Sequence, residues 1–343
     1  MDGAVENSAS GEKLSAVVWR QFKRNHIAVA GFYIVVVLAG IALGADFLAN
    51  DKPYYLRYQG NLYFPIVRSY LVELGFAQPP PALLNVNYKT LQHDGALFPP
   101  IPYRPSSIDL TAPFARPSAD HWLGTDKLGR DVMAGIVHGS RISLSIGFVS
   151  VGIALVIGVF LGALAGYFGS WVDLAISRLF ELELAIPTFF LLITVAAVLP
   201  PSIFLTMLII GLTGWVGIAR FTRNEFLKIR NLDFVTAALA LGASNGKIMF
   251  RHILPNALAP VMVSIVLGVA GAILLESGLS FLGIGVPAET VTWGSILNEA
   301  RSNTFAWWLA VFPGIAIFIT VLAYYLVGEG LRDALDPRLR GLR

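Results

Sequence analysis

One uncharged stretch decides the fold class of this chain: it reads ISLSIGFVSVGIALVIGVFLGALAGYFGS from Ile142 to Ser170. These 29 residues contain no Asp, Glu, Lys, Arg or His. A helix rises about 1.5 Å per residue, so about 20 apolar residues cross the hydrocarbon core of a bilayer. The stretch therefore predicts a membrane-spanning helix.

Five further runs of this kind flank it. They are Ile27–Ala45, Leu184–Leu199 (which is long enough only if the stretch from Leu174 extends it), Ile203–Ala219, Ala257–Leu275 and Trp307–Gly328. Six spans use up most of the chain, so we expect an all-α membrane protein with six transmembrane helices. We place the first helix at residues 27–49 and the other five within residues 142–328.

The composition agrees with this class. Hydrophobic residues make up 55% of the 343 residues and charged residues 14%, against roughly 25% charged in an ordinary globular protein. Mean hydropathy is +0.67 and the net charge is only +3. This excludes a disordered chain, a coiled coil or a collagen, and it argues against a nucleic-acid partner. The chain has no cysteine, which excludes disulfides, zinc–thiolate sites and cysteine nucleophiles.

Lys and Arg in the short loops predict the orientation. Residues 1–26 carry four, residues 220–256 carry six and residues 329–343 carry four, whereas the turn at 199–202 has none. All three basic segments lie on one side if every run spans. We therefore expect a multi-pass protein with both termini in the cytoplasm, residues 1–26 and 329–343 being cytoplasmic segments.

Apolar residues at helical spacing precede the first span. They are Leu14, Val17, Val18 and Phe22. With Lys and Arg around them, they predict a short amphipathic helix resting on membrane lipid at the cytoplasmic interface. A cleaved signal peptide is the alternative for the first run, but the run is longer than the usual apolar region and five spans follow it. Residues 1–12 look like a frayed tail.

The segment at 50–141 differs in composition from the rest. Eleven of the 19 prolines fall between Pro53 and Pro117, and seven of the 11 tyrosines fall between Tyr54 and Tyr103. Proline at this density forbids long helices. We expect an extracytoplasmic insert of short extended pieces and turns, which could cap the outer mouth, receive a soluble partner or act only as a packed spacer.

No catalytic or cofactor site is assembled in the sequence. Gly242 to Lys247 has three residues between its glycines rather than the four of a phosphate-binding loop, and Ile248 replaces the magnesium-binding Ser or Thr. The five histidines lack metal-ligand spacing. We therefore expect no enzyme, no metal and no cofactor in this chain.

Glycines four residues apart predict close helix packing. One pair is Gly40 and Gly44, and a second series is Gly158, Gly162 and Gly166. Such ridges let helix backbones approach one another.

The loop at 220–256 is the most informative segment. Asp233 can cap a helix through Leu241, whose face carries Val235, Ala238, Leu239 and Leu241, and Gly242 can end it in the left-handed conformation. Ser244 can cap a second helix over Asn245–His252, which must stop before Pro255. A helix pair with the small residues Ala238, Ala243 and Ser244 near its apex is suited to a groove on a partner. The alternative is an interfacial pair resting on lipid.

Spacing in this loop resembles a family motif. Thr236-Ala237-Ala238, then Gly242, then Leu254-Pro255 is similar to the EAA loop of ABC-importer permeases, EAA-x3-G-x9-I-x-L-P. Two positions depart, since Thr236 replaces the Glu and His252 replaces the Ile.

The resemblance extends over nearly the whole chain. Its other parts are Trp19–Asn25, His121–Asp131 with Gly139–Arg141, Glu276–Gly285 with Trp293-Gly294, and Gly330–Arg338. Together they resemble the OppC/DppC-type permease subunit of oligopeptide and dipeptide ABC importers. Asn50–Pro53, Arg57-Tyr58 and Tyr63–Pro65, in an unusually long insert, are most similar to the Yej-type (microcin C) branch.

That resemblance implies a type I ABC importer permease in a bacterial inner membrane. It implies a second homologous permease subunit, two cytoplasmic ATPases that carry ATP-Mg and an extracytoplasmic substrate-binding protein as partners. It also implies that the ATPases couple to the loop through Val235, Thr236, Ala237, Ala238, Leu241, Gly242, Ala243, Ser244, Leu254 and Pro255. The cargo would be a peptide or peptide-like molecule, although nickel, glutathione and opine importers share the motifs.

Two other readings of the residues are an ion-coupled transporter or channel and a membrane scaffold. The first usually needs ionisable residues at the membrane centre, but Glu181, Glu183 and Glu276 lie toward span ends. Arg178 is three residues before Glu181, within helical pairing reach. The second leaves the helix pair at 233–255 unexplained.

Overall fold

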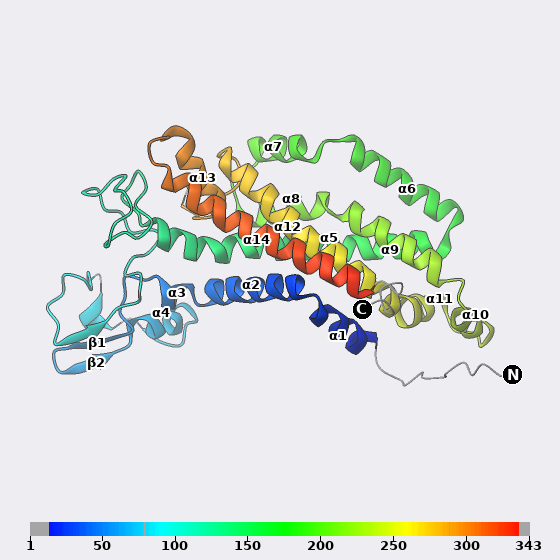
Figure 1. The fold of residues 1–343 in the computed structure, drawn as a ribbon, viewed down its shortest axis with the longest axis horizontal. Coiled ribbons are helices and arrows are strands. Elements are labelled where there is room, and N and C mark those ends of the chain that lie inside the picture. Colours follow the sequence, from blue (N-terminus) through cyan, green and yellow to red (C-terminus); the bar gives the residue numbers. More distant parts are fainter. Residues whose placement is uncertain (1–13, 79, 85, 288, 336–343) are drawn as a thin grey trace.

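The protein is an elongated helical bundle with a small sheet-containing region at one end (Figure 1). The computed structural model describes residues 14–78, 80–84, 86–287 and 289–335. Strands β1 to β3 and helices α4 and α13 lie at one end of the long helices. Helices α10 and α11 lie at the other end, where α1 and the last turns of α14 are also found. We call the end with the strands the insert end and the end with α10 and α11 the loop end.

Five helical segments are long and apolar enough to cross a membrane. They are α2 (His26–Leu43), α5 (Val132–Phe168), α8 with α9 (Ile203–Thr213 and Trp215–Ile229), α11 through α12 (Asn245–Phe281) and α14 (Trp308–Leu335). A sixth candidate is the pair α6 (Ser170–Ala185) and α7 (Thr188–Val198), which is bent by 73°. The expected six spans are present if this pair counts as one broken span.

Pro187 causes the break between α6 and α7. It has no N–H to donate and pushes the residue before it out of the helical region. Ile186 accordingly has φ −101° and ψ 117°. The run from Leu174 to Leu199, which was expected to form this span, is therefore bent at this residue.

Several helices extend beyond the uncharged runs. Helix α5 begins at Val132 rather than Ile142, because Asp131 caps it by accepting a hydrogen bond from Ala134 N at 2.7 Å. Residues 132–141 of the expected insert are therefore helical and continue directly into the span. Arg141 is tolerated inside the helix since its guanidinium donates to the carboxylate of Asp46 at 2.9 Å.

The first part of the segment expected at 220–256 is likewise helical. Helix α9 continues to Ile229, and Arg223 on it forms a two-armed ion pair with Asp173 of α6. At the C-terminal end, α14 continues from the uncharged run as far as Leu335. Charged side chains that find a partner on another helix do not end their own helix, so α5 and α9 extend past the uncharged runs.

Helix α1 (Leu14–Arg24) confirms the expected N-terminal helix. Its Phe22 is buried and lies beside Ala28 and Gly330, so α1 packs on α2 and α14. Asn25 then caps α2 by accepting from Ala28 N at 3.1 Å. The first span is shorter than residues 27–49, because α2 ends at Leu43 and the four-residue helix α3 (Ala45–Leu48) follows a turn.

The two glycine series behave differently despite equal spacing. A Cβ on Gly162 would lie 2.4 Å from Ala219 O, and one on Gly166 would lie 2.5 Å from Cβ of Phe226. This ridge on α5 seats α9 at backbone contact, as expected. Around Gly40 of α2 there is no atom of the described chain within 4 Å of such a Cβ. The Gly40 and Gly44 pair therefore does not pack helices within this chain.

The insert contains short elements, as its prolines predict. A three-stranded antiparallel sheet has the order β2-β1-β3, with β1 Tyr55–Tyr58, β2 Asn61–Tyr63 and β3 Gly95–Leu97. Leu56 pairs with Tyr63 on one side and with Ala96 on the other. Helix α4 (Pro65–Glu73) and a 3-10 turn, η1 (Pro81–Leu83), lie between β2 and β3.

Candidate coupling site

The first helix of the coupling site is α10 (Asp233–Ala240). Leu232 occupies the cap position and makes no side-chain cap bond, so the expectation that Asp233 caps the helix is wrong by one residue. Asp233 lies instead in the first turn, where its negative charge interacts favourably with the helix dipole. Thr236, which stands where the family motif has Glu, donates its hydroxyl to Asp233 O at 2.9 Å.

Gly242 ends α10 as expected. Its φ is +76°, in the left-handed region that glycine adopts without a Cβ penalty. Gly242 N donates to Leu239 O at 2.9 Å and Ala243 N donates to Ala238 O at 3.1 Å. These two bonds form a Schellman motif, in which the turn satisfies the last carbonyls of the helix.

The second helix does not stop before Pro255. Ser244 makes no side-chain cap bond, α11 covers only Asn245–Lys247, and the chain continues through a π-helical turn, η2 (Ile248–Ile253), into α12 (Leu254–Phe281). Leu254 N donates to Met249 O, five residues back. The wider π turn precedes a proline, which has no N–H to place in the ladder, at the start of α12. The helical rod therefore runs from the apex of the loop into the fifth span.

Burial divides α10 into an anchored side and an open side. Val235 is 1% exposed and packs against Phe226 and Ile229 of α9 and against η2. Ala238, Ala243 and Leu254 lie at the edge of this cluster. Leu241 is 88% exposed, and Leu239 is also exposed. The expectation that Val235, Ala238, Leu239 and Leu241 share one face is therefore wrong.

The remaining expected coupling residues lie on the open side. Thr236, Ala237, Gly242, Ser244 and Pro255 are all exposed. A partner that engages the loop would thus meet small residues and Leu241, while Val235 holds the helix to the bundle.

Three side chains that sequence reasoning missed tie the loop to α5. Tyr167 donates its hydroxyl to Asn245 Oδ1 at 2.8 Å. Arg230 donates to Gly166 O at 3.1 Å and to Tyr167 O at 3.2 Å, so it satisfies carbonyls at the C-terminal end of α5. Basic residues that follow a helix were visible in the sequence, but their partners 63 and 64 positions away were not.

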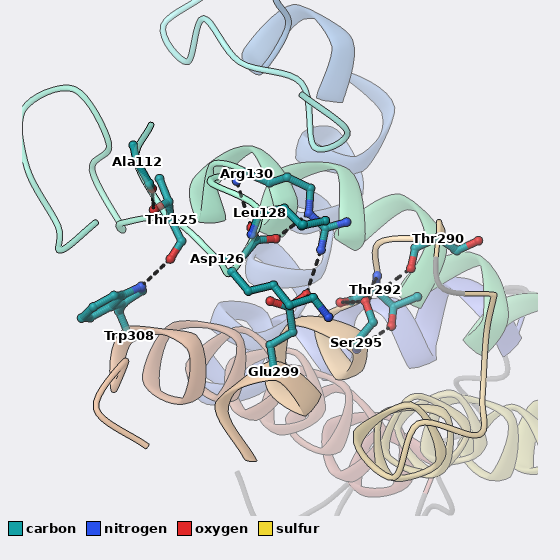
Figure 2. Close-up of polar contacts among 11 residues, drawn as sticks. Ala112, Thr125, Asp126, Leu128, Arg130, Thr290, Thr292, Ser295, Glu299 and Trp308 are labelled. Atoms are coloured by element: carbon teal, nitrogen blue, oxygen red, sulfur yellow. Dashed lines mark hydrogen bonds and ion pairs between the residues drawn. The ribbon is translucent and has the colours of Figure 1, made fainter. Parts of the chain in front are cut away.

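A denser polar network holds the insert end together, and Figure 2 shows it. Asp126 accepts from Leu128 N at 2.8 Å and from Arg130 N at 2.9 Å, and its second oxygen accepts from Arg130 Nε. Arg130 Nη2 also donates to Glu299 Oε1 of α13 (Trp293–Ser302) at 2.8 Å. Burial raises the pKa of Glu299, and nearby Asp126 raises it further while Arg130 lowers it.

Hydrogen bonds of the same network join other elements. Thr125 Oγ1 donates to Ala112 O at 2.6 Å, and Trp308 Nε1 of α14 donates to Thr125 O at 2.9 Å. Thr292 caps α13 through a reciprocal capping box with Ser295. The stretch His121–Asp131, singled out by its resemblance, is thus a structural junction of the insert, α5, α13 and α14 (Figure 2).

Two of the three acidic residues considered for ion coupling, Glu181 and Glu276, have partners close in the sequence. Arg178 forms an ion pair with Glu181, as its spacing predicts. Glu276 is fully buried, and its carboxyl accepts from Ser280 at 2.7 Å. Among the described residues there is no group of three or more side chains that could hold a metal ion.

Comparison with known families decides the identity of the fold. A model described as "Binding-protein-dependent transport system inner membrane component" matches residues 158–341, which include the whole coupling site. The chain belongs to this family. A second model, "N-terminal TM domain of oligopeptide transport permease C", matches residues 13–71. This permease is therefore the membrane component of an ABC importer, and it works with other ABC components that include the separate ATPase subunits.

Curated relatives agree over most of the length. The permease is 43% identical to the dipeptide transport system permease protein DppC of Alkalihalophilus pseudofirmus, over 71% of this chain and 82% of that protein. It is 36% identical to the inner membrane ABC transporter permease protein YejE of Escherichia coli, over 93% of this chain and 96% of that protein. The longer match bears out the similarity to the Yej-type branch. It is 34% identical to the glutathione transport system permease protein GsiD of Pectobacterium atrosepticum, over 94% and 90%.

A solved structure supports the fold alone. A chain of the MetNI methionine ABC transporter in inward-facing form superposes with a TM-score of 0.50 at 20% identity. The match covers 60% of this chain and 98% of that chain. The type I importer permease fold is therefore confirmed.

Proposed function

We propose that this permease forms one half of a translocation pathway for peptides or peptide-like molecules. The other half would be a second homologous permease subunit. Two ATPases carrying ATP-Mg would bind the loop end, and a substrate-binding protein would deliver cargo at the insert end. The family membership supports an importer, and the names of relatives that import dipeptides and glutathione support peptide-like cargo.

The coupling site is the observation that carries the proposal. An exposed apex at Leu241 and Gly242 stands beside a buried anchor at Val235. A partner that grips the apex would move α10 as a unit, since the Schellman motif fixes its end. Val235 would pass that movement to α9 and η2, and η2 runs directly into α12.

A second path would reach α5. Tyr167 and Arg230 hydrogen-bond across the boundary between α5 and the loop segments. Movement of α5 and α12 together would switch the translocation pathway between inward-facing and outward-facing forms. The permease itself would supply only the lever and the wall of the pathway.

The proposed orientation places both termini and the coupling site in the cytoplasm. The basic residues of the segments at 1–26, 220–256 and 329–343 support it. The chain has no cysteine, so single cysteines report cleanly. We expect Ser10→Cys to resist an impermeant thiol reagent in intact cells and Ser106→Cys to react. Labelling of Ser10→Cys from outside would contradict the orientation.

The function is tested by affinity purification of the tagged permease from its native membrane. We expect two ATPase polypeptides and a second permease to co-purify. Reconstituted vesicles should accumulate labelled trialanine only when the binding protein and ATP are both supplied. Uptake driven by a proton or sodium gradient in the absence of ATP would instead favour a secondary transporter.

A further inference from the structure

The insert contains a cavity that neither the coupling site nor the ion-pair network uses. Its volume is about 810 Å³, within the usual range of roughly 300–1,000 Å³ for small-molecule sites. Its lining includes Lys52, Arg68, Glu73, Lys89, Tyr103 and Asp109. We refer to it as the insert cavity.

One wall is formed by α4 and the segment before β1. Lys52 Nζ donates to the hydroxyl of Ser69, and Arg68 donates to the carbonyl of Gln78 at 2.9 and 3.1 Å. No ion pair joins either cation to a carboxylate of the described residues. Glu73 at the end of α4 forms no ion pair in that part of the chain either, although its negative charge acts on Lys52 and raises the pKa of that ammonium against the effect of burial. This wall therefore carries charges that are hydrogen-bonded at most to neutral groups.

A second part of the lining carries the same combination of signs. Lys89 Nζ lies 3.4 Å from the ring centroid of Tyr103, a cation–π contact, and forms no ion pair within the described ranges. Asp109 accepts hydrogen bonds from Thr111 and forms no ion pair there, although its charge and that of Lys89 act on one another. Tyr88 adds a second aromatic surface to this wall.

The floor of the cavity is fixed to the bundle. His121 lies beneath Tyr103 with the ring centroids 4.5 Å apart, and its Nδ1 lies 2.8 Å from Asp131, the residue that caps α5. At the centre, Arg104 and Asp51 form their own ion pair at 2.6 Å. The cavity is therefore preorganised, which reduces the entropic cost of binding a ligand.

The charges select among ligand classes. A metal cation or a phosphate matches only one sign, and an apolar molecule would desolvate the free charges without pairing them. Burial also lowers the pKa of both Lys52 and Lys89, and a bound carboxylate would favour their charged forms. A ligand with one ammonium and one carboxylate pairs with both signs at once.

We propose that the insert cavity binds a short zwitterionic peptide, with its carboxylate toward Lys52 and Lys89 and its ammonium toward Glu73 and Asp109. The ligand class follows the proposed cargo, so the inference rests on that function. The site would hold cargo at the insert end of the permease, outside the membrane-spanning helices. It adds a binding role to a chain whose family membership assigns only a membrane component.

The test measures binding of three probes to the full permease complex in lipid nanodiscs by calorimetry. Trialanine carries both end charges, N-acetyl-trialanine keeps only the carboxylate, and trialaninamide keeps only the ammonium. We expect trialanine to bind at least about tenfold more tightly than either derivative, since a charge-assisted hydrogen bond contributes about that much. Equal affinity for the three probes, or no trialanine binding, would overturn the proposal.

Two sets of variants locate the site. Lys52→Gln with Lys89→Gln should weaken trialanine and N-acetyl-trialanine about tenfold and leave trialaninamide unchanged. Glu73→Gln with Asp109→Asn should do the converse. Lys228→Gln, at the far end of α9, is the matched control and should change none of the three. Weaker binding of all probes in both double variants would indicate a disturbed insert and contradict the assignment of the two poles.

The same preparations separate this inference from the proposed function. Each is assayed for ATPase co-purification and for uptake that depends on the binding protein. Uptake without cavity binding overturns the cavity and leaves the importer in place. If the double variants lose the binding protein while trialanine binding is unchanged, the cavity is a protein-docking surface and the proposal fails.

Discussion

The two ends of this permease are built in opposite ways. At the loop end, α10 is anchored by one fully buried side chain, Val235, and Leu241 beside its turn is open. At the insert end, Asp126, Arg130 and Glu299 form a nearly closed network that joins elements 169 residues apart. The loop end presents an exposed surface to a partner, whereas the polar groups of the insert end bond mainly to one another.

This difference indicates where a partner can move the permease. A helix that transmits movement must be packed on the bundle at one point and accessible to the partner at another, and α10 meets both conditions. The insert end must keep its shape while the helices below it move, because a cavity or docking surface there depends on fixed geometry. Substitutions at the loop end should therefore affect coupling, and substitutions at the insert end should affect stability.

The largest effect is expected at the turn of the loop. Gly242→Glu forces a side chain into φ +76°, which costs about 1 kcal/mol or more, and places an unpaired charge at the apex. We expect uptake to fall more than tenfold, with normal membrane insertion, and ATPase recovery in pull-downs to fall or to lose its link to transport.

Gly246 supplies the matched control for this prediction. Like Gly242, it has open space around an added Cβ, but its φ is not positive. Gly246→Ala should be neutral, whereas Gly242→Ala should retain a measurable defect. If Gly242→Glu keeps full uptake and a full complement of ATPase, the turn is not the coupling element.

A large loss of stability is expected at the insert end. Arg130→Met leaves Glu299 buried with only the longer contact to Lys127 at 4.0 Å, and removing one partner of a buried pair costs about 3 kcal/mol or more. Thermal unfolding of the purified permease should shift down by several degrees, while ATPase recovery per folded permease stays unchanged. Arg130→Met combined with Glu299→Gln should recover part of the loss. A double variant no more stable than the single one would show that the network is not held by charge pairing.

Prolines, and glycines at the same spacing, have different structural consequences at different places in this chain, because the neighbouring elements differ. Gly242 was predictable because a Schellman turn depends on residues within one helical turn. Pro187 breaks a span, as expected for proline, yet Pro255 does not, because the π turn before it absorbs the missing bond. The ridge at Gly162 packs α9, while Gly40 has the same spacing and no packed neighbour in the described chain.

The insert could be predicted only as a class. Its prolines excluded long helices, which the structure confirms, but the β1 to β3 pairing joins residues about 40 positions apart. The lining of the insert cavity comes from α4 and from segments before β1 and on both sides of β3, and no local pattern links them. Long-range contacts of this kind are also what sequence reasoning missed in Tyr167 and Asn245.

Smaller effects are expected from two substitutions at the loop end, one at the buried Val235 and one at the exposed Leu241. Val235→Ala removes two buried methyl groups and should lower stability by about 1–2 kcal/mol, with only a mild loss of uptake. Leu241→Ala trims an exposed side chain and should leave the unfolding temperature unchanged, yet weaken ATPase binding. Both quantities are measured on the same preparations. A stability loss at Leu241 with none at Val235 would reverse the two roles.

The smallest expected effect is a pH dependence at Glu299. Its pKa is raised in the folded chain, first by burial and then by Asp126, relative to its ordinary value near 4.3 in an unfolded chain. A carboxyl with a raised folded pKa contributes stability that is fully present below the unfolded pKa and is lost as pH rises through the folded pKa. The wild type should therefore lose stability over the pH range that begins near the unfolded value of about 4.3, and Glu299→Gln should not show this loss. The difference between the two unfolding temperatures, followed across that range, isolates this residue because all other titrating groups are shared. Parallel profiles would mean that Arg130 fully offsets the burial of Glu299, and the insert end would then be neutral to pH at this position.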